Sequence, residues 1–239
     1  MFLRKERSFH EVINDLNSDL VNVFKVLRDP AGAARLHELL LLTPFARAEF
    51  EDSFGQTFTD LQDNIERARL TIFRSMAGFG SAGFRPDYTT GFRGKSLRSN
   101  TTPAHDWASL HQYIPTFTER LQGVVIERMP ALELIEKYDS PDTLFYCDPP
   151  YVPETRSSLK STGRYVYEMD LQAHEALGKA LNRVRGRVVL SGYYSKIYAK
   201  LFKKWRTVEK DALADGARKR TEVLWMNFTC ELLLESANV

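Results

Sequence analysis

The segment Asp148-Pro149-Pro150-Tyr151 carries the residue types in this chain that are best suited to chemistry. It follows the apolar run at residues 144–147 (Leu-Phe-Tyr-Cys), which has the length and aromatic content of a buried parallel strand. The two prolines end such a strand, because each lacks a backbone N–H donor and has a fixed φ. Asp148 and Tyr151 are therefore expected at the carboxyl end of a strand, where open α/β sheets bind their ligands.

An aromatic amine is the substrate group that these residues suit. Its lone pair is delocalised into the ring, so attack on a methyl sulfonium requires acceptors that draw on the two N–H bonds. The Asp148 carboxylate can accept one N–H bond, and the Pro149 carbonyl can accept the other. The Tyr151 ring offers a flat face to an extruded nucleobase, a contact worth about 1–3 kcal/mol where such stacking has been measured. The alternative interpretation is a tight turn that only ends the strand.

A second acid, Asp15, also stands at the end of an expected strand. It follows the apolar residues 10–14 and precedes an amphipathic helix at 16–27. An acid in this position of a nucleotide-binding sheet can accept hydrogen bonds from ribose hydroxyls. The alternative is a cap for the helix that follows. Residues 17–19 (Asn-Ser-Asp) are assigned to the first turn of that helix.

Residues 74–98 are rich in glycine and carry an excess of positive charge. The basic residues are Arg74, Arg85, Arg93, Lys95 and Arg98, the single acid is Asp87, and Phe79, Phe84, Tyr88 and Phe92 lie among them. So many glycines make ordering costly unless a partner fixes the segment. Arginines and aromatic side chains suit DNA phosphates and groove edges, so we predict DNA contacts for Arg85, Arg93, Lys95 and Arg98. The alternative is a mobile surface loop without a contact role.

A switch between two hydrophobic periodicities predicts the elements that position these residues. Strands are expected at residues 10–14, 123–127, 143–147, 187–190, 206–210 and 222–228. Helices are expected at 16–27, within 35–76 and most clearly at 60–73, and at 106–121, 131–138, 170–184 and 195–202. Such alternation predicts an α/β fold with a mostly parallel, doubly wound sheet.

Composition is that of an ordinary globular chain. Its 239 residues, 43% hydrophobic and 27% charged, suit one compact domain or a domain with a sizeable insertion. No apolar run approaches the ~20 residues of a membrane span and no signal peptide begins the chain, so a cytoplasmic location is expected. The two cysteines and five histidines lack ligand spacing, so no metal is expected. A net charge of +2 does not by itself indicate nucleic acid.

Several segments, taken together and in this order, resemble the Dam-type adenine-specific DNA methyltransferases, and more particularly those of prophages and restriction systems. The segments are residues 11–20, 43–47, 65–69, 119–121, 139–151 and 220–227. The resemblance implies a Rossmann-like S-adenosylmethionine-dependent methyltransferase sheet with a helical and loop target-recognition insertion. It implies that residues 148–151 catalyse methyl transfer from S-adenosylmethionine to the exocyclic amine of a flipped adenine in double-stranded DNA. It also assigns Asp15 to the ribose of S-adenosylmethionine.

The resemblance further implies a division of the chain. Residues 1–43 and 116–239 would form the catalytic domain, and residues 44–115 the target-recognition insertion. The last two strands would then be antiparallel. We leave Arg220 and Glu222 outside the catalytic set, as a structural or DNA-side pair. Tyr165, Asp170 and His174 belong either to a segment that closes over substrate or, as we expect, to a helix capped by Asp170.

Two departures from the family pattern affect the cofactor site. The family's first motif, a strand ending in a Phe-x-Gly-Gly type loop, is expected just before residues 3–6, and this chain begins at Met1. We therefore expect an N-terminal truncation, a gap between the strands at 10–14 and 143–147, marginal stability and weak cofactor binding. Pro130 stands near a position where many relatives carry an acid that contacts the cofactor's adenine ring.

Two alternatives to an active DNA methyltransferase stay open. One is a catalytically impaired prophage remnant that binds DNA, and the other is an RNA base methyltransferase. The glycine-rich insertion favours DNA over RNA. The oligomeric state is left open.

Overall fold

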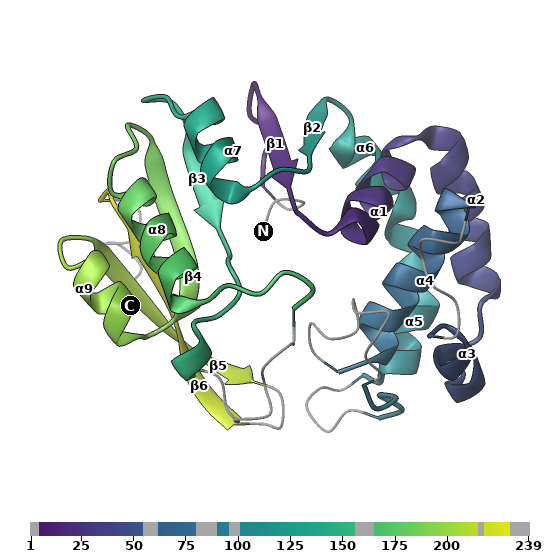
Figure 1. Cartoon of the computed structure of the whole chain (residues 1–239). Coiled ribbons are helices and arrows are strands. Elements are labelled where there is room, and N and C mark those ends of the chain that lie inside the picture. The colour runs from purple at the N-terminus through teal and green to yellow at the C-terminus, as the bar shows by residue number, and fades with distance from the viewer. Residues whose placement is uncertain are drawn as a thin grey trace, which may run out of the picture. The chain divides into compact units, whose positions relative to one another are not determined.

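The computed structural model describes residues 5–54, 62–79, 90–95, 101–155, 165–214 and 218–229. The chain divides into two compact units (Figure 1). The N-terminal unit holds the described residues up to Met129 together with 165–167, and the C-terminal unit holds the others from Pro130 on. This structural division differs from the predicted functional one, in which residues 44–115 form the recognition region. That functional division stays a prediction.

The N-terminal unit is mainly helical. Its elements are β1 (Glu11–Asn14), α1 (Ser18–Arg28), α2 (Pro30–Leu42), α3 (Arg47–Asp52), α4 (Asn64–Ala77), α5 (Pro103–Leu110), the 3-10 turn η4 (His111–Tyr113), α6 (Ile114–Leu121) and β2 (Val124–Glu127). β1 and β2 pair in parallel, with Glu11 opposite Val124 and Asn14 opposite Glu127. The carboxyl ends of both strands therefore meet at one edge of this two-stranded sheet.

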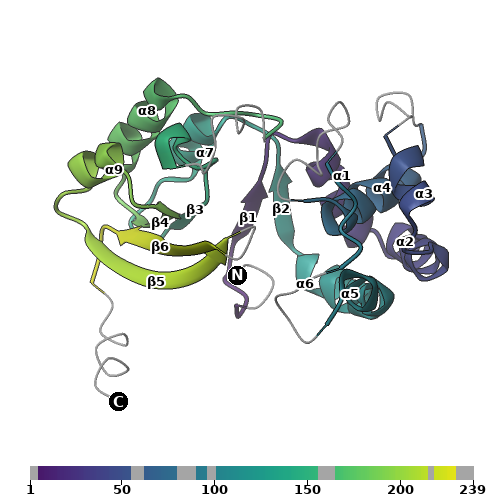
Figure 2. The ribbon, with the colours of Figure 1, turned by 90° about the horizontal axis from the view of Figure 1, so that it is seen from below.

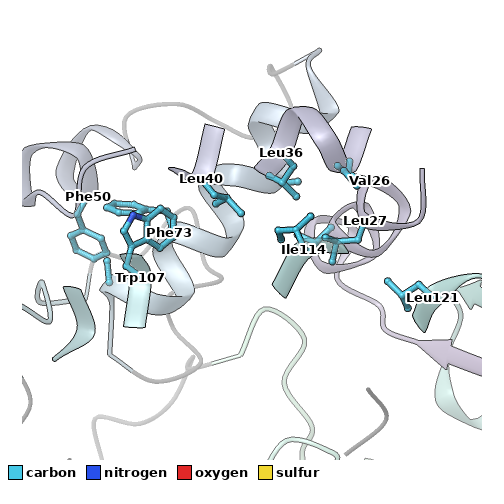
Figure 3. Packing of buried hydrophobic residues seen from close by; sticks show 13 residues of the cluster. Val26, Leu27, Leu36, Leu40, Phe50, Phe73, Trp107, Ile114 and Leu121 are labelled. Carbon is cyan, nitrogen blue, oxygen red and sulfur yellow. The ribbon is translucent and has the colours of Figure 1, made fainter. Parts of the chain in front are cut away.

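One hydrophobic core joins the helices of the N-terminal unit (Figure 3). Val26 and Leu27 of α1 and Leu36 and Leu40 of α2 supply its aliphatic part. Phe50, Phe73 and Trp107 supply an aromatic part, in which the Phe73 and Trp107 ring centroids lie 4.9 Å apart and nearly perpendicular. Helices before residue 44 and helices after it thus share buried side chains, which is why the compact unit does not end at residue 43.

The C-terminal unit is an α/β layer. Its elements are α7 (Ala131–Tyr138), β3 (Leu144–Cys147), the 3-10 turn η5 (Pro153–Thr155), α8 (Leu171–Leu181), β4 (Arg187–Tyr193), α9 (Lys196–Leu201), β5 (Arg206–Ala214) and β6 (Arg218–Met226). The strand order is β3-β4-β6-β5. β3 and β4 are parallel, whereas β6 pairs antiparallel with both β4 and β5. The antiparallel final pair is therefore confirmed.

The expected α/β class is confirmed, but the described sheets are mixed and not mostly parallel. Half of the strand pairings are antiparallel, because the β5–β6 hairpin supplies β4 with its second neighbour. Helices α7, α8 and α9 all lie on one face of the four-stranded sheet (Figure 2). Phe145 is buried on the helix-covered face, but its neighbours Leu144 and Tyr146 are 57% and 44% exposed. β3 is consequently half-buried and not the fully buried strand that its composition indicated.

β1 and β3 belong to two separate sheets in the part of the chain that the structure describes. The expected gap between them in one sheet stays a prediction.

Polar side chains begin most of the helices, since they accept hydrogen bonds from the first free N–H groups. The capping residues are Asn17, Asp29, Asp63, Thr102, Asp170 and Ser195, for α1, α2, α4, α5, α8 and α9 respectively. The expected cap at Asp170 is confirmed. Among the described residues, no helix is long and apolar enough to cross a membrane.

Candidate active site

The segment Asp148–Tyr151 lies where the sequence predicts it, directly after β3. The parallel ladder ends with Cys147 opposite Leu190, and the chain then leaves the sheet at the two prolines. Val152, only 2% exposed, fixes the far side of this loop in the core. The turn that follows is closed by Thr155, whose backbone N–H and hydroxyl both donate to the Val152 carbonyl, at 2.9 and 2.8 Å. The loop is thus held at both ends, with Asp148 and Tyr151 between them.

The second wall of the site comes from β4. Tyr193 is the last residue of β4, and its ring centroid lies 4.4 Å from that of Tyr151, with the rings inclined at 46°. Four residues of the loop and four from β4 and α9 line one small depression: Pro149, Pro150, Tyr151, Val152, Ser191, Gly192, Tyr193 and Tyr198. The structure therefore brings the predicted catalytic loop together with Tyr193, which the sequence analysis did not single out.

The floor of this depression is rigid. Tyr198 of α9 is 2% exposed, and its hydroxyl is 2.8 Å from Nδ1 of the fully buried His174. The Tyr198 ring also meets Trp225 edge-on, with centroids 5.2 Å apart. Burial raises the pKa of Tyr198, so its hydroxyl stays protonated at neutral pH. His174 is accordingly a core residue beneath the site and does not belong to a closing segment.

Asp148 lies in an environment that favours its neutral form. Burial of part of the carboxyl group raises its pKa, and the nearby Glu222 carboxylate raises it further. Burial also raises the pKa of Cys147 to about 12, with a smaller contribution from Asp148. Asp148 nevertheless stays exposed enough to reach a substrate. A carboxylate of raised pKa binds a proton more readily than an ordinary surface aspartate.

Glu222 belongs to this site, although the sequence analysis left it outside. It pairs with Tyr193 across β4 and β6, and directly opposed residues of an antiparallel pair project from the same face. The pattern of sequence alone contained no signal for this proximity, because residues 148, 193 and 222 are far apart in the chain. The Arg220 side chain lies outside the described residues.

Asp15 stands at the carboxyl end of β1 in the N-terminal unit. Its backbone N–H donates to the Glu127 carbonyl, and its Oδ1 accepts from the Asn17 backbone N–H at 2.7 Å. Burial raises its pKa. Its Oδ2 accepts no hydrogen bond within the described part of the chain. The alternative that Asp15 caps the next helix is wrong, because Asn17 accepts from the Asp19 N–H and is the cap of α1.

Two side-chain contacts hold the strand ends beside Asp15. The Asn14 amide exchanges two 3.0 Å hydrogen bonds with the backbone of Met129, and Arg128 Nε donates to the Leu16 carbonyl. The Asn14 side chain thereby continues the hydrogen bonding between β1 and β2 beyond the last backbone pair. The sequence analysis missed both contacts. The polar residue Asn14 at the last position of the expected strand could have indicated the first of them.

Of the basic segment at residues 74–98, the structure describes residues 74–79 and 90–95. Arg93 and Lys95 lie in the second range, whereas the other two predicted DNA contacts, Arg85 and Arg98, lie outside the described residues. The Arg93 backbone N–H donates to the Ala77 carbonyl at 2.7 Å. Phe92 packs on the aromatic part of the core, with its centroid 5.2 Å from Phe45 and 5.7 Å from Phe50.

Gly78 allows this segment to approach helix α4. A Cβ at Gly78 would lie 2.6 Å from Thr90 Oγ1 and 2.9 Å from the Arg74 carbonyl, closer than real Cβ atoms come. Arg47 also belongs to this region, with its guanidinium carbon 5.0 Å from the Phe92 ring centroid. Three basic residues, Arg47, Arg93 and Lys95, therefore gather at the attachment of the segment.

Other arginines of the N-terminal unit serve the fold. Arg74, which the sequence analysis counted with the basic segment, is fully buried in α4 and lies over the Phe54 ring. Arg69 binds Glu49 and Glu66, and Arg67 binds Asp19 and Ser18 of α1. Arg74 is consequently not accessible to a nucleic acid. Among the described residues, no group of three or more His, Cys, Asp or Glu side chains could hold a metal ion.

The helices and the parallel and antiparallel strands of the two units define a mixed α/β protein. The sequence matches the family model of the D12 class N6 adenine-specific DNA methyltransferases over residues 1–216, so the chain belongs to that family. No curated protein was found to match it. The chain is therefore an adenine-specific DNA methyltransferase that uses S-adenosylmethionine.

Proposed function

We propose that the loop after β3 receives the target adenine and that its residues carry methyl transfer to N6. The Asp148 carboxylate accepts one N–H bond of the exocyclic amine, and the Pro149 carbonyl accepts the other. Tyr151 stacks on the base, and Pro150 stiffens the loop between them. The observation that supports this assignment most directly is the Tyr151–Tyr193 contact, which places an aromatic surface beside an acid of raised pKa.

The electron flow of the reaction fits this site. S-adenosylmethionine supplies an electrophilic methyl group on sulfur. Acceptors on both N–H bonds would localise the lone pair of the amine for attack on that methyl group, and the electrons of the broken S–C bond would stay with the sulfur. The nitrogen would then carry one proton too many. The Asp148 carboxylate, which accepts one of the two N–H bonds, can take this proton, and its raised pKa favours that transfer.

We assign the ribose of S-adenosylmethionine to Asp15. The support is the position of this acid at the carboxyl ends of the parallel β1–β2 pair and its unused Oδ2. The hydrogen bonds from Asn14 and Arg128 keep the neighbouring backbone in place. With the carboxyl group preorganised, little ordering cost remains for the ligand.

We assign duplex DNA to the basic segment and to residues 44–115 around it. An adenine inside a duplex hides its amine, so it must be flipped out before the loop after β3 can hold it. Arg93 and Lys95 supply phosphate contacts, and the same role is proposed for Arg85 and Arg98 from the sequence alone. The attachment through Phe92 supports this assignment, since it holds the segment against the core at one point.

Replacement of the proposed acceptor tests the assignment. Asp148→Ala should lower kcat by roughly 100- to 1,000-fold, the effect of removing one preorganised transition-state contact, with little change in DNA affinity. Methyl transfer from tritiated S-adenosylmethionine to unmethylated genomic DNA measures the rate. Asp142→Ala, at an exposed acid just before β3, is the matched control. An Asp148→Ala enzyme that methylates as fast as its parent would contradict the proposal.

We further propose that the enzyme is of the restriction or prophage type, for which the support is the resemblance of the segments at 43–47, 65–69 and 139–151. A restriction system requires that methylation protects DNA. Host DNA methylated by this enzyme should then resist an endonuclease encoded beside the methyltransferase gene. If no such endonuclease is encoded there, the prophage type is the interpretation that remains.

A further inference from the structure

Tyr193 makes a contact that the proposed roles of Asp148, Pro149 and Tyr151 do not explain. Its ring centroid is 4.4 Å from that of Tyr151, at the close end of the range for aromatic pairs. Tyr151 belongs to the loop after β3, and Tyr193 ends β4. The contact therefore joins the loop to the sheet through two side chains.

The two members of this pair are held differently. The backbone of Tyr193 is fixed in the ladder between β4 and β6, where Gly192 pairs with the buried Val223 and Tyr193 pairs with Glu222. Directly after it, Ser195 caps α9 by accepting from the Tyr198 N–H. Tyr151 lies in irregular backbone between Pro150 and Val152. Tyr193 is thus the fixed ring, and Tyr151 is the ring whose orientation needs support.

We propose that Tyr193 is a positioning residue for methyl transfer: it backs the Tyr151 ring and so holds the surface on which the flipped adenine stacks. The proposal rests on the proposed function of the loop after β3. A tyrosine ring free to turn about χ1 and χ2 would lose that freedom when the base arrives, and this loss would weaken the complex. A ring that already leans on Tyr193 loses less, and it keeps the amine beside Asp148.

A purely structural role for Tyr193 predicts a different outcome when its side chain is removed. If the pair only stabilises the unit, its removal lowers the melting temperature and leaves the folded enzyme as active as before. If Tyr193 positions Tyr151, its removal changes the state of the flipped base in the folded protein. The experiment must therefore observe the base itself as well as turnover.

The test compares Tyr193→Ala with Tyr193→Phe, which keeps the ring, and with Tyr194→Ala, which removes the exposed neighbouring tyrosine. Methylated positions in DNA treated with the wild-type enzyme define the target adenine. A duplex with 2-aminopurine at that position then reports flipping and stacking by its fluorescence intensity and lifetime, without any need for turnover. Steady-state methylation gives kcat and KM for the same duplex with adenine.

We expect Tyr193→Ala to lower kcat by roughly three- to tenfold, the range that an aromatic pair is worth, and to lengthen the 2-aminopurine lifetime because the flipped base is stacked less well. Tyr193→Phe and Tyr194→Ala should both stay within about twofold of wild type, as expected where the ring is kept or lies outside the site. Normal kcat and normal fluorescence in folded Tyr193→Ala would overturn the proposal. Equal losses in Tyr193→Phe and Tyr193→Ala would also overturn it, since they would point to the hydroxyl.

Failure of the underlying site assignment would look different. Asp148→Ala should lower kcat by roughly 100- to 1,000-fold and leave the 2-aminopurine signal intact, because Asp148 acts on the amine and not on the stacking of the ring. An Asp148→Ala enzyme as active as its parent would reject the loop as the methylation site. A strongly impaired Asp148→Ala enzyme beside an unaffected Tyr193→Ala enzyme would reject only the role of Tyr193.

Discussion

Asp148 and Glu222 place two acids at one end of the four-stranded sheet, and their interaction should govern the pH dependence of turnover. Partial burial is the main cause of the raised pKa of Asp148, and the Glu222 charge adds to it. In the proposed mechanism Asp148 must be ionised to accept from the amine, so kcat should fall as the pH drops through this pKa.

Glu222→Gln removes the like charge and should lower the pKa of Asp148. The acidic limb of the kcat–pH profile should then move to lower pH, with the plateau at neutral pH little changed. Profiles of the parent and the variant, measured on the same DNA, show the shift. Glu209→Gln, at an exposed acid on β5, should leave the limb in place. Identical limbs for parent and Glu222→Gln would mean that Glu222 does not act on Asp148.

Residues 90–95 are attached to the core by the Phe92 ring and by hydrogen bonds to the end of α4, and the charged side chains of Arg93 and Lys95 are proposed to bind DNA. Substituting Arg93 or Lys95 by alanine should weaken binding to all duplex sequences. Each substitution should also reduce the slope of log K against log salt concentration by about one. Binding isotherms at several salt concentrations measure this slope. Lys203→Ala, at an exposed lysine in the C-terminal unit, is the control. Unchanged slopes would show that these residues do not contact DNA phosphates and would favour the alternative of a surface loop without a contact role.

The elements themselves were largely predictable from local pattern. The helix at 131–138 was predicted with the bounds of α7, and the strands at 10–14, 123–127 and 143–147 agree with β1, β2 and β3 to within one residue. Periodicity and turn residues act over a few positions, so one sequence contains them. The start of α2 at Pro30 was missed, although Asp29 before it is a good cap.

The errors concern contacts between distant segments. Arg74 was counted with the basic residues, and only its packing against Phe54 and Ser53 shows that it is buried. Tyr193 and Glu222 reach the site through strand pairing, which no local pattern contains. The exposed faces of Leu144 and Tyr146 were missed for the same reason, since the side on which helices pack is a property of the whole unit.

At the scale of the whole molecule, one buried ion pair should control the acid stability of the N-terminal unit. Glu11 of β1 accepts two hydrogen bonds from Arg120 of α6, at 2.7 and 2.9 Å, and also binds Lys5 and the Ser8 N–H. These contacts, Arg120 first, lower the pKa of Glu11 to about 2. Because the pKa of Glu11 is lower in the folded state, the ionised carboxylate stabilises the fold at pH values above the unfolded-state pKa near 4.5. This contribution is lost as the pH falls toward 2.

Glu11→Gln should therefore destabilise the protein at pH 7 by about 3–5 kcal/mol, since it leaves Arg120 buried without its charge partner. The difference between variant and parent should shrink between about pH 4.5 and pH 2. Thermal unfolding across this range measures it. Glu38→Gln breaks the exposed Arg35–Glu38 pair and should change stability by less than about 1 kcal/mol. A pH-independent difference for Glu11→Gln would contradict the assignment.

The attachment of residues 90–95 has a consequence for which substitutions the protein tolerates. Gly78 has no room for a side chain and Phe92 fills part of the aromatic core, so substitutions at either position should lower stability. Lys95 is exposed, and substitutions at such positions usually change stability by less than about 0.5 kcal/mol. If residues 90–95 bind DNA as proposed, changes beside the attachment point would alter that contact while the protein still folds.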